Sequence, residues 1–224
     1  MTIQREMRDA DSPLVHRVAR ITCEQDDTFL STPDGLWDLV IRTHRGQVMV
    51  LQTGPVTRPV HVPFEAGDES IGIAFNPGVF MPRLPGMRMR DEAIFRPTEN
   101  GRTFWIDREE FEIPTFENAE GLVNELVRRG IIVLDPVVAR AVAGDPQPVS
   151  DRSVQRHFRR VLGMSPHQLR QILRAADALA ALERGTPPID VAQQLGYVDQ
   201  AHLASSLQRF MGRTPGQIQR SRRT

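Results

Sequence analysis

Two segments near the end of the chain carry apolar residues at helical spacing, and their patterns match position by position. The apolar positions are Val154, Phe158, Val161 and Leu162 in residues 150–166, and Leu203, Leu207, Phe210 and Met211 in residues 199–215. Residues spaced by three and four positions lie on one side of a helix. The pattern therefore predicts two amphipathic helices, over residues 150–162 and 199–211, that belong to one repeated unit.

The residues at the ends of the two predicted helices repeat as well. Each copy opens on a residue that can cap a helix, ends on a glycine, and continues with a hydroxyl residue and a proline that suit the start of another helix. These residues are Ser150, Gly163, Ser165 and Pro166 in the first copy, and Asp199, Gly212, Thr214 and Pro215 in the second.

A long amphipathic segment joins the two copies. It runs from Pro166 to just before Gly185 and places leucine, isoleucine and alanine residues on one stripe. A helix of about 19 residues rises about 28 Å, and successive major grooves on one face of B-DNA lie about 34 Å apart. The segment from Ile189 to Leu195 predicts a helix that supports the second copy. Two equivalent helices held by a stiff spacer suit a partner with a regular repeat, and duplex DNA is such a partner.

The first half of the chain has a different pattern. Short β-prone runs alternate with Gly and Pro from residue 15 to residue 111, which is typical of a small antiparallel sandwich or incomplete barrel. The clearest runs are Trp37–Ile41, Val48–Leu51, Val60–Val62 and Ser70–Phe75. The aromatic residues expected in its core are Trp37, Phe75, Phe80 and Trp105. The segment from Met81 to Arg90 is rich in Pro and Gly and predicts a mobile loop that lids a pocket or contacts a partner.

Two further helices are predicted between these regions, from Glu117 to Arg129 and from Val137 to Ala143. We therefore predict an α+β chain of two domains: a β-rich sandwich or partial barrel, and an all-α double helix-turn-helix built around a long linker helix. The predicted boundaries are residues 1–115 for a β-rich sensory or dimerisation domain, 116–135 for a connecting helix and 136–224 for a DNA-binding domain.

Charge is divided between the two halves. Residues 145–224 hold 12 arginines and 6 acidic residues, a net charge of +6, whereas residues 1–144 hold 16 arginines and 22 acidic residues, a net charge of −6. An acidic half joined to a basic half suits a sensory module linked to a polyanion-binding module. The sequence contains no lysine. Arginine can contact phosphate or guanine through two parallel hydrogen bonds.

The repeated region resembles the DNA-binding domain of AraC/XylS-type transcription regulators. The residues that carry the resemblance are IDVAQQLGYVDQAHL at 189–203, FMGRTP at 210–215, and the motifs QRHF and GMSP at 155–158 and 163–166. The resemblance implies two helix-turn-helix units, each inserting its second helix into a major groove. More weakly, PDGLWDL at 33–39 and GPVTRP at 54–59 resemble the cupin-like β-rich domains that precede such domains in some regulators.

The sequence departs from the family pattern at two positions. Pro146 falls where the supporting helix of the first unit is expected to end, opposite Leu195 of the second unit, and a proline there removes a backbone donor. Either the helix at Val137–Ala143 replaces that supporting helix or the first unit is shortened. Ser205 stands where the family commonly carries arginine, as the first unit does at Arg156.

The face of the first repeated helix opposite its apolar stripe predicts the main DNA-reading surface. Its candidate residues are Arg152, Gln155, Arg156 and Arg159. Arginine can bond guanine and glutamine can bond adenine, so this stripe is suited to read bases. The alternative is a solvated arginine face on an ordinary surface helix.

The matching face of the second repeated helix carries no formal charge. Its candidate DNA-binding residues are Gln200, Ala201, His202, Ser205 and Gln208. We therefore predict unequal half-sites, with the first unit supplying most of the base recognition. Arg213 is a candidate phosphate contact. Arg220, Arg222 and Arg223 are either further phosphate contacts or part of a disordered basic tail.

No catalytic, metal or cofactor site is predicted. Histidines and carboxylates do not fall at metal-binding spacing, and the single cysteine, Cys23, excludes a disulfide within the chain. No signal peptide or apolar span is recognised, so we expect a cytoplasmic protein. The expected partners are double-stranded operator DNA, a small-molecule effector of unknown identity, RNA polymerase and a second copy of the chain. The alternative functions are a cupin-like enzyme with a DNA-targeting domain and an architectural DNA binder.

Overall fold

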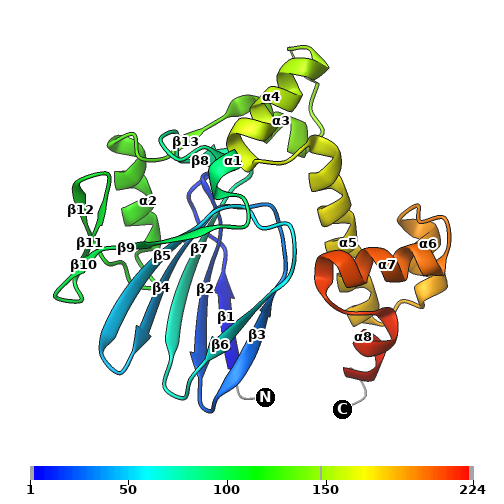
Figure 1. Ribbon diagram of the computed structural model, residues 1–224, viewed down its shortest axis with the longest axis horizontal. Coiled ribbons are helices and arrows are strands. Elements are labelled where there is room, and N and C mark those ends of the chain that lie inside the picture. The colour runs from blue at the N-terminus through cyan, green and yellow to red at the C-terminus, as the bar shows by residue number, and fades with distance from the viewer. Residues whose placement is uncertain (1–2, 147, 222–224) are drawn as a thin grey trace.

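The computed structural model describes residues 3–146 and 148–221, and it has a β-rich part followed by a helical part (Figure 1). We use "β-rich part" for residues 3–134 and "helical part" for residues 135–146 and 148–221. This arrangement confirms the predicted fold class. Within the described ranges, no helix is long and apolar enough to cross a bilayer.

A six-stranded antiparallel sheet forms the centre of the β-rich part. Its strands, in spatial order, are β1 (Ile3–Arg8), β2 (Val15–Cys23), β7 (Glu69–Phe75), β4 (Asp38–His44), β5 (Gln47–Thr53) and β9 (Ala93–Arg96). Alternation along each strand separates the two faces of the sheet. In β4, Leu39 and Ile41 point into the core, whereas Arg42 lies on the opposite face. The predicted strand runs therefore lie in real strands.

A two-stranded ribbon covers this opposite face. It pairs β3 (Asp27–Ser31) with β6 (Val60–Phe64). The guanidinium of Arg42 lies 4.7 Å from the ring centre of Phe64, and that of Arg5 lies 5.6 Å from the ring centre of Phe29. Two strands of the large sheet thus contact two strands of the ribbon, which gives the β-rich part the character of a partial sandwich.

The core face of the large sheet is covered by helix α2 (Ala119–Arg128) and a small sheet of β10 (Thr98–Glu99), β11 (Thr103–Ile106) and β12 (Glu109–Glu112). Phe104 and Ile106 of β11 are buried, and Trp105 between them is half-buried. The prediction that Trp105 lies in the core is therefore wrong, because strand alternation turns it to the other side. Trp37, Phe75 and Phe80 are buried as predicted.

Residues 79–89 belong to the β-rich part and pack against α4 of the helical part. Strand β8 (Val79–Phe80) pairs with β13 (Val133–Leu134), and the segment predicted as a mobile loop contains helix α1 (Gly86–Met89). In Figure 1, α1 lies beside the first repeated helix. Gly86 and Met89, at the two ends of this short helix, are buried.

The helical part contains both copies of the repeated unit. Its elements are α3 (Pro136–Ala143), α4 (Asp151–Leu162), α5 (Pro166–Arg184), α6 (Pro188–Gln194), α7 (Gln200–Met211) and α8 (Pro215–Ser221). The predicted linker is α5, which has 19 residues. Its buried side includes Ile172, Ala175 and Leu182, and it packs against α7 and α8.

The ends of the two repeated helices match as the sequence predicted. The Ser150 hydroxyl accepts from the Ser153 amide at 3.4 Å, and the Asp199 carboxylate accepts from the His202 amide at 2.7 Å. Gly163 and Gly212 close α4 and α7 in the left-handed region, each at φ 68°. Both copies therefore form the same capped helix.

Helix α3 takes the supporting position in the first copy. The Asp135 carboxylate caps α3, and its Oδ2 atom lies 2.6 Å from Nδ1 of His157 on α4. Pro146 follows the end of α3 instead of interrupting it. The structure therefore shows that residues 137–143 supply the supporting helix and that the first unit is not shortened.

The β-rich part contacts the C-terminal end of α4. The indole Nε1 of Trp37 donates to the Val161 carbonyl at 2.9 Å, and Nη1 of Arg90 donates to the Gly163 carbonyl at 2.8 Å. The Val161 carbonyl lies in the last turn of α4 and the Gly163 carbonyl in the residue that caps it, where no amide of the same helix follows to pair with them. The β-rich part thus supplies donors that the helix lacks.

Replacing Trp37 with phenylalanine is expected to lower the free energy of unfolding by about 1–3 kcal/mol, because the Val161 carbonyl loses its donor. Urea unfolding of the full chain measures the change. Trp105→Phe is the matched control, since Trp105 is half-buried and its loss is expected to cost about 0.5 kcal/mol or less. Equal effects from the two substitutions would show that the indole does not hold α4.

Candidate nucleic-acid interface

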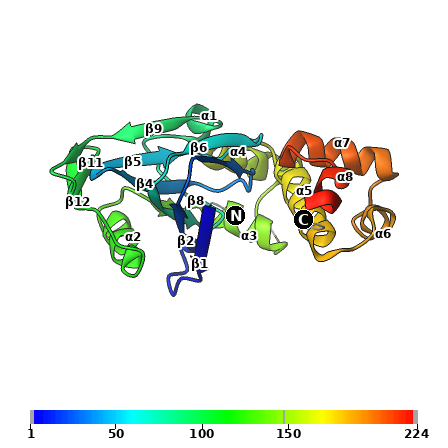
Figure 2. The ribbon, with the colours of Figure 1, turned by 90° about the horizontal axis from the view of Figure 1, so that it is seen from below.

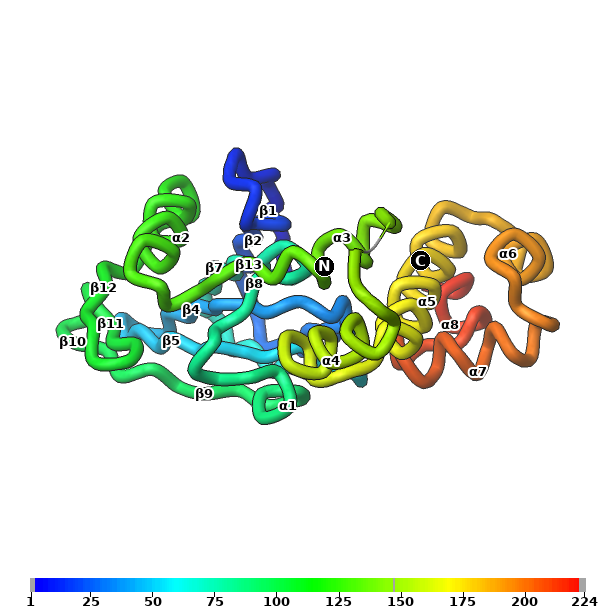
Figure 3. The backbone as a smooth tube through the Cα atoms, turned by 90° about the horizontal axis from the view of Figure 1, so that it is seen from above, coloured from blue at the N-terminus to red at the C-terminus, as the bar shows by residue number. Residues whose placement is uncertain are grey.

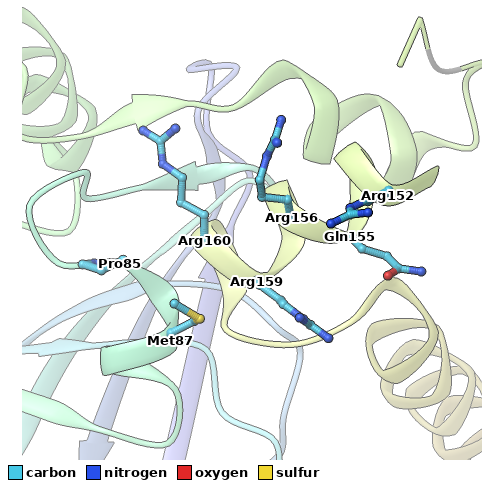
Figure 4. Close-up of a pocket in the computed structure, with 7 residues that line it drawn as sticks. All are labelled: Pro85, Met87, Arg152, Gln155, Arg156, Arg159 and Arg160. Atoms are coloured by element: carbon cyan, nitrogen blue, oxygen red, sulfur yellow. The ribbon is translucent and has the colours of Figure 1, made fainter. Parts of the chain in front are cut away.

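The outward face of α4 carries the side chains that the sequence predicted as a reading surface. Arg152, Gln155, Arg156 and Arg159 are all exposed. Together with Arg160, Pro85 and Met87 they line a hollow of about 490 Å³ (Figure 4). The structure thus gathers the four predicted residues of the first unit on one concave surface.

Packing on the other side of α4 fixes this face. Val154, Phe158, Val161 and Leu162 are buried. Arg156 lies two residues before Phe158, about 200° around the helix, so burial of the Phe158 ring turns Arg156 outward. The cap at Ser150 and the His157–Asp135 contact hold the beginning and the middle of the helix.

The electrostatic surroundings of the α4 arginines suit a polyanion. Within residues 3–146 and 148–221, Arg152, Arg156 and Arg159 form no ion pair with a carboxylate. The guanidinium of Arg160 lies 5.2 Å from the ring centre of Phe80. Three cations on one helix without partners of opposite charge favour a ligand that supplies negative charge.

The outward face of α7 is different in chemistry. Gln200, Ala201, His202, Ser205 and Gln208 are exposed, as the sequence predicted for this face. The His202 ring also packs edge-on against Tyr197, with ring centres 5.2 Å apart. This surface offers hydrogen-bonding and small apolar groups, with no arginine at the positions equivalent to Arg152 and Arg156.

Two exposed apolar side chains beside α7, one in the turn before it and one in α6, were not among the residues predicted from the sequence. Val198 is 86% exposed and Ile189 is 60% exposed, and both border the same shallow surface as Gln200 and Ala201. The signal was present in the sequence, because Val198 directly precedes the cap residue Asp199 and lies outside the apolar period of α7. Apolar side chains at such a position can contact the methyl group of thymine.

Arg213 does not line the hollow beside α4 or the shallow surface beside α7. Its Nη1 atom is 3.3 Å from the Glu183 carboxylate, and its Nη2 atom donates to the Ser221 hydroxyl at 3.0 Å. The side chain lines a cavity between the β-rich part and α5. The structure therefore does not bring Arg213 together with the other candidate residues. Arg222 and Arg223 lie outside the described residues.

Helices α4 and α7 lie on the same side of the molecule, which Figures 2 and 3 both show. Helix α1 lies on that side as well. Figure 1 shows α4 steeply inclined and α7 lying across the view, so the two helices are not parallel. Helices α4 and α7 thus lie on one side of the molecule and run in different directions.

The cavity beside Arg213 has a volume of about 280 Å³ and is lined by polar and apolar residues of both parts. Asp38 is one of its lining residues. Burial, and then the negative charge of Asp34, raise the pKa of the Asp38 carboxyl to about 7 from an ordinary value of 3.8.

The raised pKa of Asp38 gives an expected pH dependence. The folded chain binds a proton at Asp38 more tightly than the unfolded chain does, so the free energy of unfolding falls as pH rises between about 4 and 7. Asp38→Asn removes this dependence. The variant is expected to be more stable than wild type at pH 8, with a smaller difference at pH 5. Urea unfolding at both pH values measures it, and a difference independent of pH would contradict the shifted titration.

Comparison with known proteins gives a match to the second half of the chain. Residues 148–221 match the sequence profile of the HTH_18 family, described as a helix-turn-helix domain. No curated protein matches the chain. Among solved structures, the fold is similar to that of ToxT from Vibrio cholerae O395, at 8% identity and a TM-score of 0.43, over 96% of this chain and 95% of that one. A second ToxT crystal form from Vibrio cholerae gives 8% identity and a TM-score of 0.41, over 96% and 97% of the two chains.

Proposed function

We propose that this protein is a DNA-binding transcription regulator that recognises an operator with α4 and α7 in successive major grooves. The match of residues 148–221 to a helix-turn-helix family supports this proposal. Each of α4 and α7 is the second helix of its unit, and in helix-turn-helix proteins the second helix is the one that contacts base edges. Both helices lie on one side of the molecule (Figures 2 and 3).

The observation that carries this proposal is the arginine face of α4. Arg152, Arg156 and Arg159 are exposed on a helix whose other side is fixed in the core, and they form no ion pair within the described ranges. The fixed helix holds the three guanidinium groups on one surface, where they are available to phosphates and bases. Arg156 and Gln155 are proposed to read bases, while Arg159 and Arg160 contact phosphates.

Helix α7 is proposed to read its half-site with weaker contacts. Ser205 and Gln208 offer hydrogen bonds, and Ala201 offers a methyl contact. A good bidentate pair is worth about 1–3 kcal/mol of discrimination, and α7 has no arginine on its reading face to form one with guanine. The operator is therefore expected to have two unequal half-sites.

Control is proposed to act through the contacts between the two parts. Helices α4 and α7 are not parallel in this structure (Figure 1), so insertion into two successive grooves of straight DNA requires a change in their relative direction. The β-rich part contacts α4 through Trp37 and Arg90. A small molecule or partner that alters these contacts changes the population of DNA-competent chains. Homodimerisation and contact with RNA polymerase are further proposals of the same kind.

A binding titration tests the proposed function directly. Labelled operator, obtained by selection from random duplex DNA, is titrated with the full chain at several salt concentrations, beside a scrambled duplex. Operator is expected to bind about 10³-fold or more tightly than scrambled DNA. Equal affinities with a steep salt dependence would instead identify an architectural binder, and the absence of binding to any duplex would contradict the proposal.

A further inference from the structure

We propose that α1, an element of the β-rich part, belongs to the DNA interface, and that its exposed Arg88 contacts a backbone phosphate beside the groove that α4 enters. This inference rests on the proposed function and extends it to a surface outside the helix-turn-helix domain.

The backbone of α1 is in direct contact with the end of α4. A Cβ atom placed on Gly86 would lie 2.4 Å from the Val161 carbonyl oxygen and 2.6 Å from the Gly163 amide nitrogen. Since a real side chain cannot occupy such a position, only glycine permits this approach. The bond from Arg90 to the Gly163 carbonyl, 2.8 Å long, adds a second link at the same place. The contact fixes where α1 lies relative to α4.

The rest of the β-rich part holds α1 in place from the other side. The Gly54 amide donates to the Glu92 carbonyl at 3.1 Å, and the Asp91 carboxylate accepts from the amide and the hydroxyl of Thr57 at 2.6 and 2.8 Å. A Cβ atom on Gly54 would lie 2.0 Å from the Met89 carbonyl oxygen. Helix α1 is thus a rigid feature of the surface.

The position of α1 places it beside bound DNA. Pro85 and Met87 line the same hollow as the α4 arginines (Figure 4), and Met87 is 65% exposed. In helix-turn-helix proteins, residues near the beginning of the recognition helix contact base edges. An element that adjoins the end of the helix, on the same side of the molecule, therefore faces the sugar-phosphate backbone that borders the groove.

Arg88 is the cation that this position offers to a phosphate. Its neighbours Arg83 and Arg90 have carboxylates at 3.8 and 3.9 Å, from Asp107 and Asp91. Arg88 is exposed, and no carboxylate in the described parts of the chain pairs with it. It is adjacent in sequence to Met87, which borders the hollow. A phosphate contact there is independent of base sequence.

The test compares Arg88→Ala with Arg128→Ala in the full chain. Arg128 is an exposed arginine on α2, which Figure 3 places on the opposite side of the molecule from α1. Affinity for selected operator and for scrambled duplex is measured by fluorescence anisotropy over a series of salt concentrations. Arg88→Ala is expected to weaken both affinities about three- to tenfold, and to reduce the slope of log affinity against log salt by about one. Arg88→Glu is expected to weaken them further, and Arg128→Ala to leave them unchanged.

Two results would overturn the inference. If Arg88→Ala and Arg128→Ala behave alike, α1 is not part of the interface; if Arg88→Ala binds more tightly than wild type, α1 obstructs α4. Thermal unfolding confirms that each variant is folded, which is expected because both arginines are exposed. If wild type itself does not prefer operator, or Arg156→Ala has no effect, the proposed function fails instead, so the two failures are distinguishable.

Discussion

Replacing Arg156 with alanine is expected to remove most of the preference of this chain for its operator over scrambled DNA. Arg156 is exposed on α4, forms no ion pair within the described ranges, and lies next to Gln155 on a helix fixed by buried Phe158. Loss of a bidentate contact to guanine costs about 1–3 kcal/mol, which corresponds to a decrease of about 5- to 150-fold in the specificity ratio.

Ser205→Ala is the matched control for Arg156→Ala, because Ser205 holds the equivalent position in the second copy, 49 residues later. A single neutral hydrogen bond contributes about 0.5–1.5 kcal/mol, so the expected loss of specificity is smaller. Competition titrations with operators changed in one half-site at a time measure both effects. Equal losses from the two variants would contradict the unequal half-sites.

Replacing Gly163 with alanine is expected to destabilise the chain more than the same change at Gly212. Both glycines end a repeated helix at φ 68°, so alanine at either position carries a backbone cost of about 1–2 kcal/mol. A Cβ atom on Gly163 would also lie 2.4 Å from the Gly86 carbonyl oxygen, whereas one on Gly212 would lie 3.1 Å from the Pro59 ring. Overpacking against backbone adds about 1–3 kcal/mol at Gly163, whereas at Gly212 a shift of the Pro59 side chain by a few tenths of an ångström relieves the contact.

Urea unfolding of the two glycine variants measures this difference. Gly163→Ala is expected to lose about 2–5 kcal/mol and Gly212→Ala about 1–2 kcal/mol. Because both variants carry the same backbone cost, the difference between their losses in free energy of unfolding reports on the contact between α1 and α4. Equal destabilisation would mean that the β-rich part does not rest on α4 in solution.

Local patterns were sufficient to predict the helical part. The apolar period placed α4, α5 and α7, and the caps at Ser150 and Asp199 and the glycines at 163 and 212 placed their ends, because these features depend on neighbours within one turn of chain. The exposed stripe of Arg152, Gln155, Arg156 and Arg159 followed from the same period. The four named β-prone runs overlap β4, β5, β6 and β7, but β1 (Ile3–Arg8) lies before residue 15, where the predicted β-rich region began.

Contacts between distant segments were not predictable. Gly86 and Gly163 are 77 positions apart, and no local sequence pattern indicates that their backbones meet. Helix α1 forms within a segment whose Pro and Gly content predicts a loop, because its burial depends on that meeting. The ion pair of Arg213 with Glu183 likewise depends on how α5 and the turn after α7 pack together.

Selection of bound duplexes from a random library by the full chain tests most directly whether two linked helices read one DNA. We expect an enriched motif with two half-sites whose centres lie about 10–10.5 base pairs apart, with guanines in the half-site read by α4. Arg156→Ala is expected to erase the guanines of that half-site and leave the other. Enrichment of a single half-site, or of no motif, would show that α4 and α7 do not read one DNA together.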